Sequence, residues 1–164
     1  MLATPSPAGA LVSFNFTIGQ GPQESISYDP YLQYTFEPWL SSESYELRPF
    51  VTGGLTFWED TDSSDSVWGL VAAFGLKLAF NGDDWHPFFS LSGGPSYISQ
   101  DYFVGKDLGG GHYLFNSRAI LGLDFGQDYQ HSFGVHATHY SNGRTQRSND
   151  GFNSWGLAYG YSFQ

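Results

Sequence analysis

Alternation of apolar and polar residues with a period of two runs through almost the whole chain. In residues 67–80, for example, Trp68, Leu70 and Ala72 alternate with small residues, and no segment shows the spacing of an amphipathic helix. Such alternation is typical of strands that bury only one face, and clusters of Gly, Asn, Asp, Ser or Pro flank each alternating segment. The pattern predicts eight strands, at residues 10–19, 25–36, 45–58, 67–80, 87–99, 112–125, 130–141 and 152–163.

The number and length of these strands suit a membrane β-barrel. An even number of strands of about ten to fourteen residues crosses a bilayer at the usual tilt. No segment approaches the roughly 18 apolar residues that a membrane-spanning helix needs, and only 13% of the residues are charged. We therefore predict an all-β, eight-stranded antiparallel transmembrane β-barrel, with bulky apolar side chains facing lipid. A soluble ligand-binding barrel, with the bulky face inside, is the alternative.

Aromatic residues, 19% of the chain, favour the membrane barrel because many lie near the ends of predicted strands. The inward positions contain few charges, and we expect Glu46, Arg118 and Asp124 to form a structural polar core, since buried charges need partners. The predicted interfacial girdle consists of Tyr45, Phe57, Trp58, Trp68, Phe80, Trp85, Tyr97, Tyr113, Phe125, Trp155, Tyr161 and Phe163.

Charge and cysteine content exclude several classes of function. The net charge is −10, and six Lys and Arg residues are too few to neutralise a nucleic acid, so no nucleic-acid partner is expected. Without cysteine, neither disulfides nor thiolate metal sites are available. The spacing of the five His residues suggests no metal site. We therefore expect no metal and no cofactor.

Residues 1–9 are small and polar, and we predict a flexible N-terminal segment before a single barrel domain at residues 10–164. This start does not resemble a signal peptide, so Met1 is interpreted as the start of a mature or recombinant chain. With an even number of strands, both termini lie on one side of the barrel. The loops at residues 19–24, 59–66, 101–111 and 142–151 are then expected on the other side.

Polar residues interrupt the apolar outward face of the last predicted hairpin. His139 and Ser141 follow Val135 and Ala137 on the outward face of one strand, and Asn153 begins the outward face of the next. Because one loop joins the two strands, the residues near its two ends are cross-strand neighbours, and the three side chains can cluster. A serine becomes nucleophilic when an imidazole accepts its proton and a third group orients the imidazole. A polar collar where the strands leave the bilayer is the alternative interpretation.

This hairpin resembles the C-terminal signature of the PagL family of outer-membrane lipid A 3-O-deacylases. The resemblance is carried by the run His139-Tyr140-Ser141-Asn142, by Asn149-Asp150-Gly151, and by the closing strand that ends in Tyr161 and Phe163. It extends weakly back through Asp107-Leu108-Gly109 to Pro87-Phe88-Phe89, whereas the earlier strands match only in pattern.

The resemblance implies an outer-membrane serine esterase of a Gram-negative bacterium, whose partner is lipid A or lipopolysaccharide. It implies that Ser141 is the nucleophile and His139 the general base. The arginines of the next loop are candidates for binding lipid A phosphates, with simple solvation as the alternative. The residues that the resemblance and this charge argument suggest for positioning the substrate or the oxyanion are Asn142, Gly143, Arg144, Arg147 and Asn149.

One position departs from the family pattern. Where the resemblance implies a glutamate as the third catalytic residue, this chain has Asn153. An amide oxygen can accept the imidazole hydrogen, but it supplies no charge to stabilise the imidazolium. Two functions are therefore compatible with the sequence. One is an active lipid A esterase, and the other is a weak or inactive relative with a structural, adhesive or lipid-binding role. The sequence leaves open whether the barrel is a monomer or a homodimer.

Overall fold

The computed structural model describes residues 10–108, 111–145 and 150–163. The first nine residues, which the sequence predicts to be a flexible segment, lie outside this range. Eight long strands dominate the described part: β1 (Leu11–Gln20), β2 (Ser25–Thr35), β4 (Tyr45–Asp60), β5 (Ser66–Phe80), β6 (Trp85–Ile98), β9 (Tyr113–Phe125), β10 (His131–Ser141) and β11 (Phe152–Phe163). The short elements are β3 (Leu40–Ser41), β7 (Tyr102–Phe103), β8 (Lys106–Asp107) and the 3-10 turn η1 (Gln127–Tyr129).

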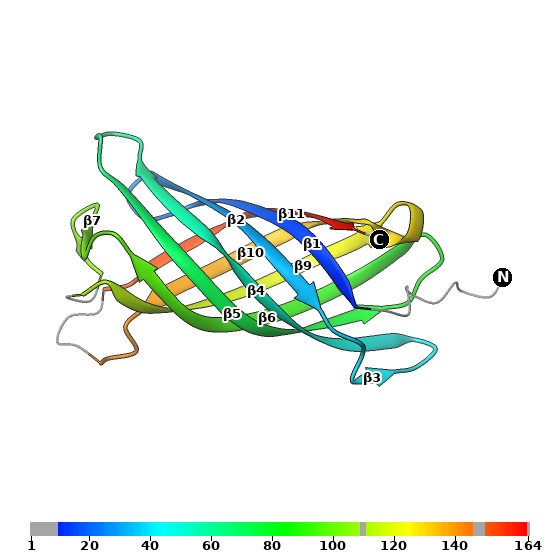
Figure 1. The fold of residues 1–164 in the computed structure, drawn as a ribbon. Helices are drawn as coiled ribbons and strands as arrows, with labels where there is room; N and C mark the ends of the chain where they lie inside the picture. The colour runs from blue at the N-terminus through cyan, green and yellow to red at the C-terminus, as the bar shows by residue number, and fades with distance from the viewer. Residues whose placement is uncertain (1–9, 109–110, 146–149, 164) are drawn as a thin grey trace.

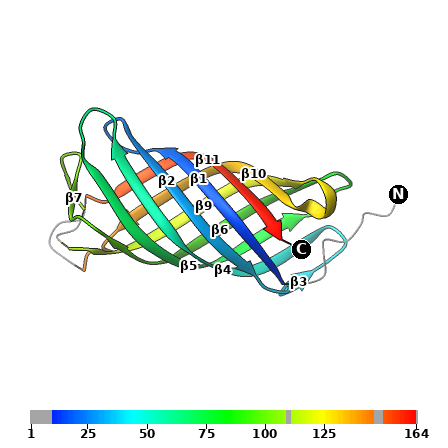
Figure 2. The same ribbon diagram turned by 45° about the horizontal axis from the view of Figure 1, so that its top comes forward.

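The eight long strands form a closed antiparallel barrel. Each pairs with its neighbours along the chain, and β1 pairs with both β2 and β11, which closes the sheet (Figures 1 and 2). The short strand β3 pairs with the start of β4, and β7 and β8 form a separate hairpin between β6 and β9. The predicted strand number and the predicted barrel are therefore confirmed. Within the described ranges, no helix has the length and apolar character needed to cross a membrane.

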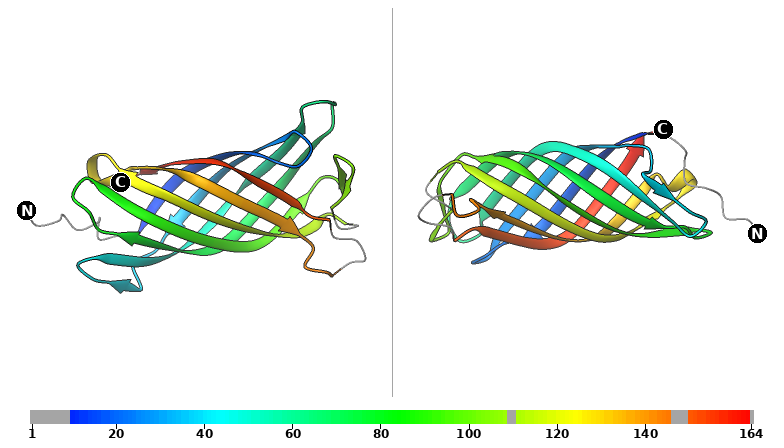
Figure 3. Two further views of the ribbon diagram at one scale, coloured as in Figure 1. Left: turned by 180° about the vertical axis from the view of Figure 1, so that it is seen from behind. Right: turned by 90° about the horizontal axis from the view of Figure 1, so that it is seen from below.

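The two ends of the barrel differ in what they carry. β1 begins and β11 ends at the same end, which we call the terminal end (Figures 1 and 3). The connections at 21–24 and 61–65 and the described parts of two others, at 99–108, 111–112, 142–145 and 150–151, lie at the opposite end, which we call the loop end. This division agrees with the predicted placement of the four outer loops.

The outer surface is apolar and the interior is polar. Leu70, Leu121 and Val135 are more than half exposed on the outside, whereas Thr17 and Asp29 are fully buried inside. A soluble β protein has the opposite arrangement, because water then surrounds the outer face. An apolar exterior around a polar interior is typical of barrels that span a membrane.

An apolar cluster closes the interior at the loop end, and we call it the aromatic plug. Trp58, predicted as a girdle residue, belongs to the plug, so that prediction was wrong. β4 continues to Asp60, so alternation keeps position 58 on the inner face. The Trp58 ring stacks on Phe152 with ring centres 4.0 Å apart. The plug consists of Trp58, Val67, Ile98, Phe103, Val104, Leu108, Leu114, Tyr140 and Phe152.

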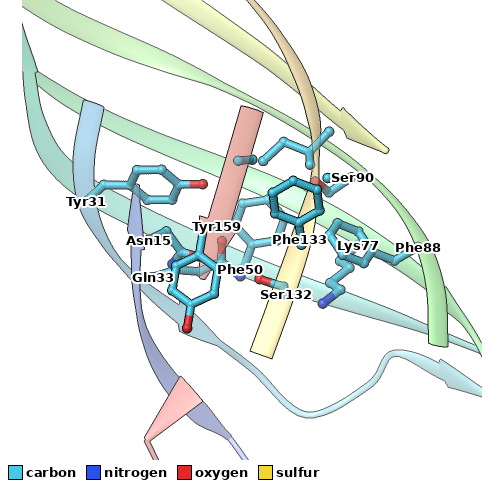
Figure 4. Close-up of a pocket in the computed structure, with 13 residues that line it drawn as sticks. Asn15, Tyr31, Gln33, Phe50, Lys77, Phe88, Ser90, Ser132, Phe133 and Tyr159 are labelled. Carbon is cyan, nitrogen blue, oxygen red and sulfur yellow. The ribbon is translucent and has the colours of Figure 1, made fainter. Parts of the chain in front are cut away.

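Two groups of charged residues occupy the interior below the plug. The loop-end cluster is Asp29 and Arg118 with three threonines, Thr17, Thr56 and Thr138. The terminal-end cluster consists of the ion pairs Glu46–Arg48 and Lys77–Asp124. The expectation that Glu46, Arg118 and Asp124 form a paired polar core is confirmed. A cavity of about 30 Å³ lies between the clusters and is lined by both Tyr31 and Lys77 (Figure 4).

Candidate active site

The last hairpin places the candidate residues on the outer surface at the loop end. His139 on β10 is directly opposite Asn153 on β11, and both side chains are exposed. Thr138 and Tyr140, on either side of His139, point into the barrel and are buried. Figure 3 shows this hairpin, in orange and red, leading into the loop end. The alternation of a regular strand therefore gives the site its outward direction.

A short hydrogen bond joins the two opposing residues. The Nδ1 atom of His139 lies 2.6 Å from the Oδ1 atom of Asn153. Because an amide oxygen can only accept a hydrogen bond, the imidazole must carry its hydrogen on Nδ1. The other ring nitrogen, Nε2, is then the acceptor. This tautomer is the one that a general base needs.

Ser141 lies two residues beyond His139 on the same face of β10 and is partly buried. The backbone of Gly151 lies beside both residues. A Cβ atom at position 151 would lie 3.4 Å from Cε1 of His139 and 3.8 Å from Cβ of Ser141. It would also lie 2.8 Å from the carbonyl oxygen of Tyr140, and φ at this position is +66°. Only glycine fits here without strain.

The chain turns sharply directly after Ser141. Asn142 is fully buried, and its Oδ1 atom accepts a hydrogen bond of 2.8 Å from the backbone N–H of Arg144. Its carbonyl oxygen accepts a second bond, of 2.7 Å, from Oγ1 of Thr145. Gly143 and Arg144 have φ values of +63° and +65° and are exposed. Arg147 and Asn149, the other predicted loop residues, lie outside the described residues.

The acidic residue nearest to the site in the loop points to another partner. The Asp150 carboxylate accepts a hydrogen bond of 3.2 Å from the backbone N–H of Asp107, and the Asp150 N–H donates to the Asp107 carbonyl at 3.1 Å. These two bonds attach the β7–β8 hairpin to the loop of the site. Asn153, rather than Asp150, is the residue that contacts His139.

Sequence reasoning did not anticipate what supports the site from inside. Alternation placed Thr138 inward, but nothing in the sequence indicated its hydrogen bond from Nε of Arg118, at 3.1 Å. Nor did the sequence indicate that Tyr140 packs against Trp58, with ring centres 4.9 Å apart. Among the residues that the structure describes, no group of three or more His, Asp or Glu side chains is arranged to hold a metal ion.

Fold and site together define a membrane-spanning β-barrel with a serine, a histidine and an amide grouped on its outer surface. The family model described as Lipid A 3-O-deacylase (PagL) matches residues 25–162, and the chain therefore belongs to this family. It is an outer-membrane β-barrel.

Two known proteins show the extent of the similarity. The lipid A deacylase PagL of Pseudomonas aeruginosa is 29% identical over 143 residues, which are 87% of this chain and 81% of that protein. A crystal structure described as the outer membrane enzyme PagL superimposes with a TM-score of 0.81 at 27% identity. That match covers 91% of this chain and 98% of the other. The similarity thus extends over nearly the whole barrel, beyond the hairpin that first suggested it.

Proposed function

We propose that this protein is an esterase that removes the 3-O-linked acyl chain of lipid A. In this proposal Ser141 is the nucleophile, His139 is the general base and Asn153 orients the imidazole. The observation that carries the proposal is the 2.6 Å contact between His139 and Asn153 on the outer surface, with Ser141 next along the same face. Membership of the lipid A 3-O-deacylase family supplies the substrate class.

The chemistry is that of a two-step acyl transfer. Nε2 of His139 accepts the proton of the Ser141 hydroxyl while Oγ forms a bond to the ester carbonyl carbon. The tetrahedral intermediate collapses, the bond to the sugar oxygen breaks, and His139 returns the proton to that oxygen. Water then attacks the acyl-serine with His139 again as the base, which releases the fatty acid and restores the Ser141 hydroxyl.

The turn after Ser141 is suited to stabilise the oxyanion. The buried Asn142 side chain holds the turn by accepting the Arg144 N–H, and the backbone amide of Gly143, an exposed residue, is a candidate donor to the negative oxygen. Arg144, and Arg147 further along the loop, are candidates for binding the phosphates of lipid A, since guanidinium groups bind phosphate through paired hydrogen bonds. The outward direction of the site has a physical advantage. A lipid in the outer leaflet reaches the nucleophile without being extracted from the membrane.

Mass spectrometry of lipid A after incubation of lipopolysaccharide with the purified protein tests this proposal. The expected result is the loss of one 3-linked acyl chain with the wild type and no change with Ser141→Ala. Ser117→Ala is the matched control, because Ser117 is an exposed serine directly opposite His139 on β9. Activity that survives in Ser141→Ala, or is lost in Ser117→Ala, would contradict the assignment of Ser141.

With Asn153 as the third residue we expect a low kcat, because an amide supplies no negative charge to stabilise the imidazolium. We expect Asn153→Glu to raise kcat, since a carboxylate stabilises the imidazolium that forms as the Ser141 proton is transferred. Asn153→Gln is the control, because Gln has the same length as Glu without the charge. If lipid A stays intact with both the wild type and Asn153→Glu, the proposal is wrong and the chain is an inactive barrel with a structural, adhesive or lipid-binding role.

A further inference from the structure

The outward direction of the site leaves it with little support on one side. His139 and Asn153 are exposed on the face that meets the membrane, so protein atoms do not surround them there. Catalytic groups need neighbours that hold their positions, and an error of about 1 Å can cost up to about a hundredfold in rate. Besides the loop backbone at Gly151, support reaches these residues through the strand backbone from the inner face.

On the inner face, Thr138 connects the strand of the site to a buried charge. Thr138 directly precedes His139, and its Oγ1 atom accepts the hydrogen bond from Nε of Arg118. The Nη2 atom of the same guanidinium donates to Oδ2 of Asp29 at 2.8 Å. The side chains of Arg118 and Asp29 are only 10% and 1% exposed. A planar guanidinium that makes bonds through two of its nitrogens is fixed in direction as well as in place.

Asp29 in turn connects this arrangement to the opposite wall of the barrel. Its Oδ2 atom also accepts a hydrogen bond of 2.8 Å from Thr17 on β1, and its Oδ1 atom accepts one of 2.6 Å from Thr56 on β4. Bonds between side chains therefore join β10 and β9 to β1, β2 and β4 through the interior. Thr56 also accepts a bond from the indole of Trp58, which connects the loop-end cluster to the aromatic plug.

We infer that three members of the loop-end cluster, Asp29, Arg118 and Thr138, position the proposed active site, with the hydrogen bond from Arg118 to Thr138 as the link that holds β10. Arg118, Asp29 and Thr138 are positioning residues, since they act through the backbone and not on the substrate. The inference rests on the proposed function, because it assigns a purpose to the cluster only if His139 and Ser141 react.

The test compares two threonines that differ in the strand they hold. Thr138 and Thr17 are 3% and 0% exposed, both bond to the cluster through a hydroxyl, and Val replaces either at nearly constant volume. We expect Thr138→Val to lower kcat for lipid A by about tenfold with little change in KM, because misplacement affects the reacting atoms more than lipid binding. Thr17→Val should leave kcat within about twofold of the wild type. Thr138→Ser keeps the hydroxyl and should restore kcat.

Thermal unfolding in detergent separates loss of fold from loss of position. Both Val variants should unfold at similar, slightly lowered temperatures. Equal kcat for Thr138→Val and Thr17→Val, or no rescue by Thr138→Ser, would overturn the inference.

Labelling of Ser141 with a fluorophosphonate separates the two proposals. If the wild type is labelled and Thr138→Val is labelled equally fast, the inference is wrong while the proposed function stands. If the wild type neither hydrolyses lipid A nor reacts with the probe, both are wrong.

Discussion

The two charged clusters inside the barrel have similar chemistry in different surroundings. Each contains a cation that pairs with a carboxylate and lies over an aromatic ring. Arg118 is 4.7 Å from the ring centre of Tyr31, and Lys77 is 4.1 Å from that of Phe88. The terminal-end cluster borders a cavity of about 60 Å³, which is large enough for water. The loop-end cluster has three threonine hydroxyls as additional partners and lies beneath the aromatic plug.

This difference shows which end of the barrel interior is held more rigidly. Hydrogen bonds that reach five strands lie at the end that carries the candidate site, where Arg118 borders a cavity of about 20 Å³, whereas the cluster at the other end borders the larger cavity of about 60 Å³. A buried charge with every bond satisfied is costly to disturb, while water can compensate a charge that borders a cavity. If Ser141 and His139 react as proposed, the interior of the loop end serves the surface chemistry, and the interior of the terminal end serves mainly the fold.

The largest expected effect comes from removing the central carboxylate of the loop-end cluster. Asp29→Asn leaves the charge of Arg118 without its counterion, and we expect a loss of about 3–5 kcal/mol in the free energy of unfolding. We also expect kcat to fall by more than about tenfold. Asp124→Asn, the matched change beside Lys77, should cost less stability and leave kcat nearly unchanged. Denaturant unfolding in detergent and lipid A turnover measure the two effects. Equal losses of kcat would remove the distinction between the ends.

A double substitution separates stability from position. Asp29→Asn combined with Arg118→Met removes both charges, and replacing a complete buried pair by neutral groups is often nearly neutral for stability. We expect the double variant to recover most of the free energy of unfolding that Asp29→Asn loses. Because Thr138 then has no guanidinium to bond, kcat should stay low. Recovery of both quantities would show that the cluster acts only on the fold.

The aromatic plug provides a smaller perturbation. Phe152 stacks on Trp58 and directly precedes Asn153, so Phe152→Leu should cost about 1–2 kcal/mol and lower kcat severalfold. Phe88→Leu, at a ring that is 6% exposed beside Lys77, should cost a similar amount of stability without a change in kcat. The same unfolding and turnover measurements apply. A fall in kcat with Phe88→Leu would mean that any loss of packing in the interior reaches the site.

The smallest expected change concerns a glycine. Gly151→Ala places a Cβ against the Tyr140 carbonyl at a positive φ, which should cost about 1 kcal/mol and reduce kcat by shifting the loop beside His139. Gly53→Ala is the control, because a Cβ on this outward glycine of β4 meets nothing within 4 Å. Thermal unfolding and turnover should change only in the first variant. Unchanged turnover in Gly151→Ala would show that the loop tolerates displacement.

Much of this fold was predictable because strand alternation is a local property. All eight long strands lie within one or two residues of their predicted bounds, and the outward direction of His139 and Asn153 follows from counting along β10 and β11. The β7–β8 hairpin was not predicted, because a few apolar residues in a polar loop form no periodic pattern. An aromatic residue near a strand end suits either a lipid interface or a plugged interior. The sequence did not separate these two places, and Trp58 was assigned to the girdle.

The sequence by itself determined which residues form strands and which side chains face the membrane, because neighbouring side chains on a strand point in opposite directions. It also marked His139, Ser141 and Asn153 as a group, since one hairpin holds them all. Only the tertiary structure decided that Asp29 pairs with Arg118, that Trp58 belongs to the plug and that the Asp150 carboxylate points toward the β7–β8 hairpin. These contacts join residues that are far apart in the chain or lie on different loops, and closure of the barrel brings them together.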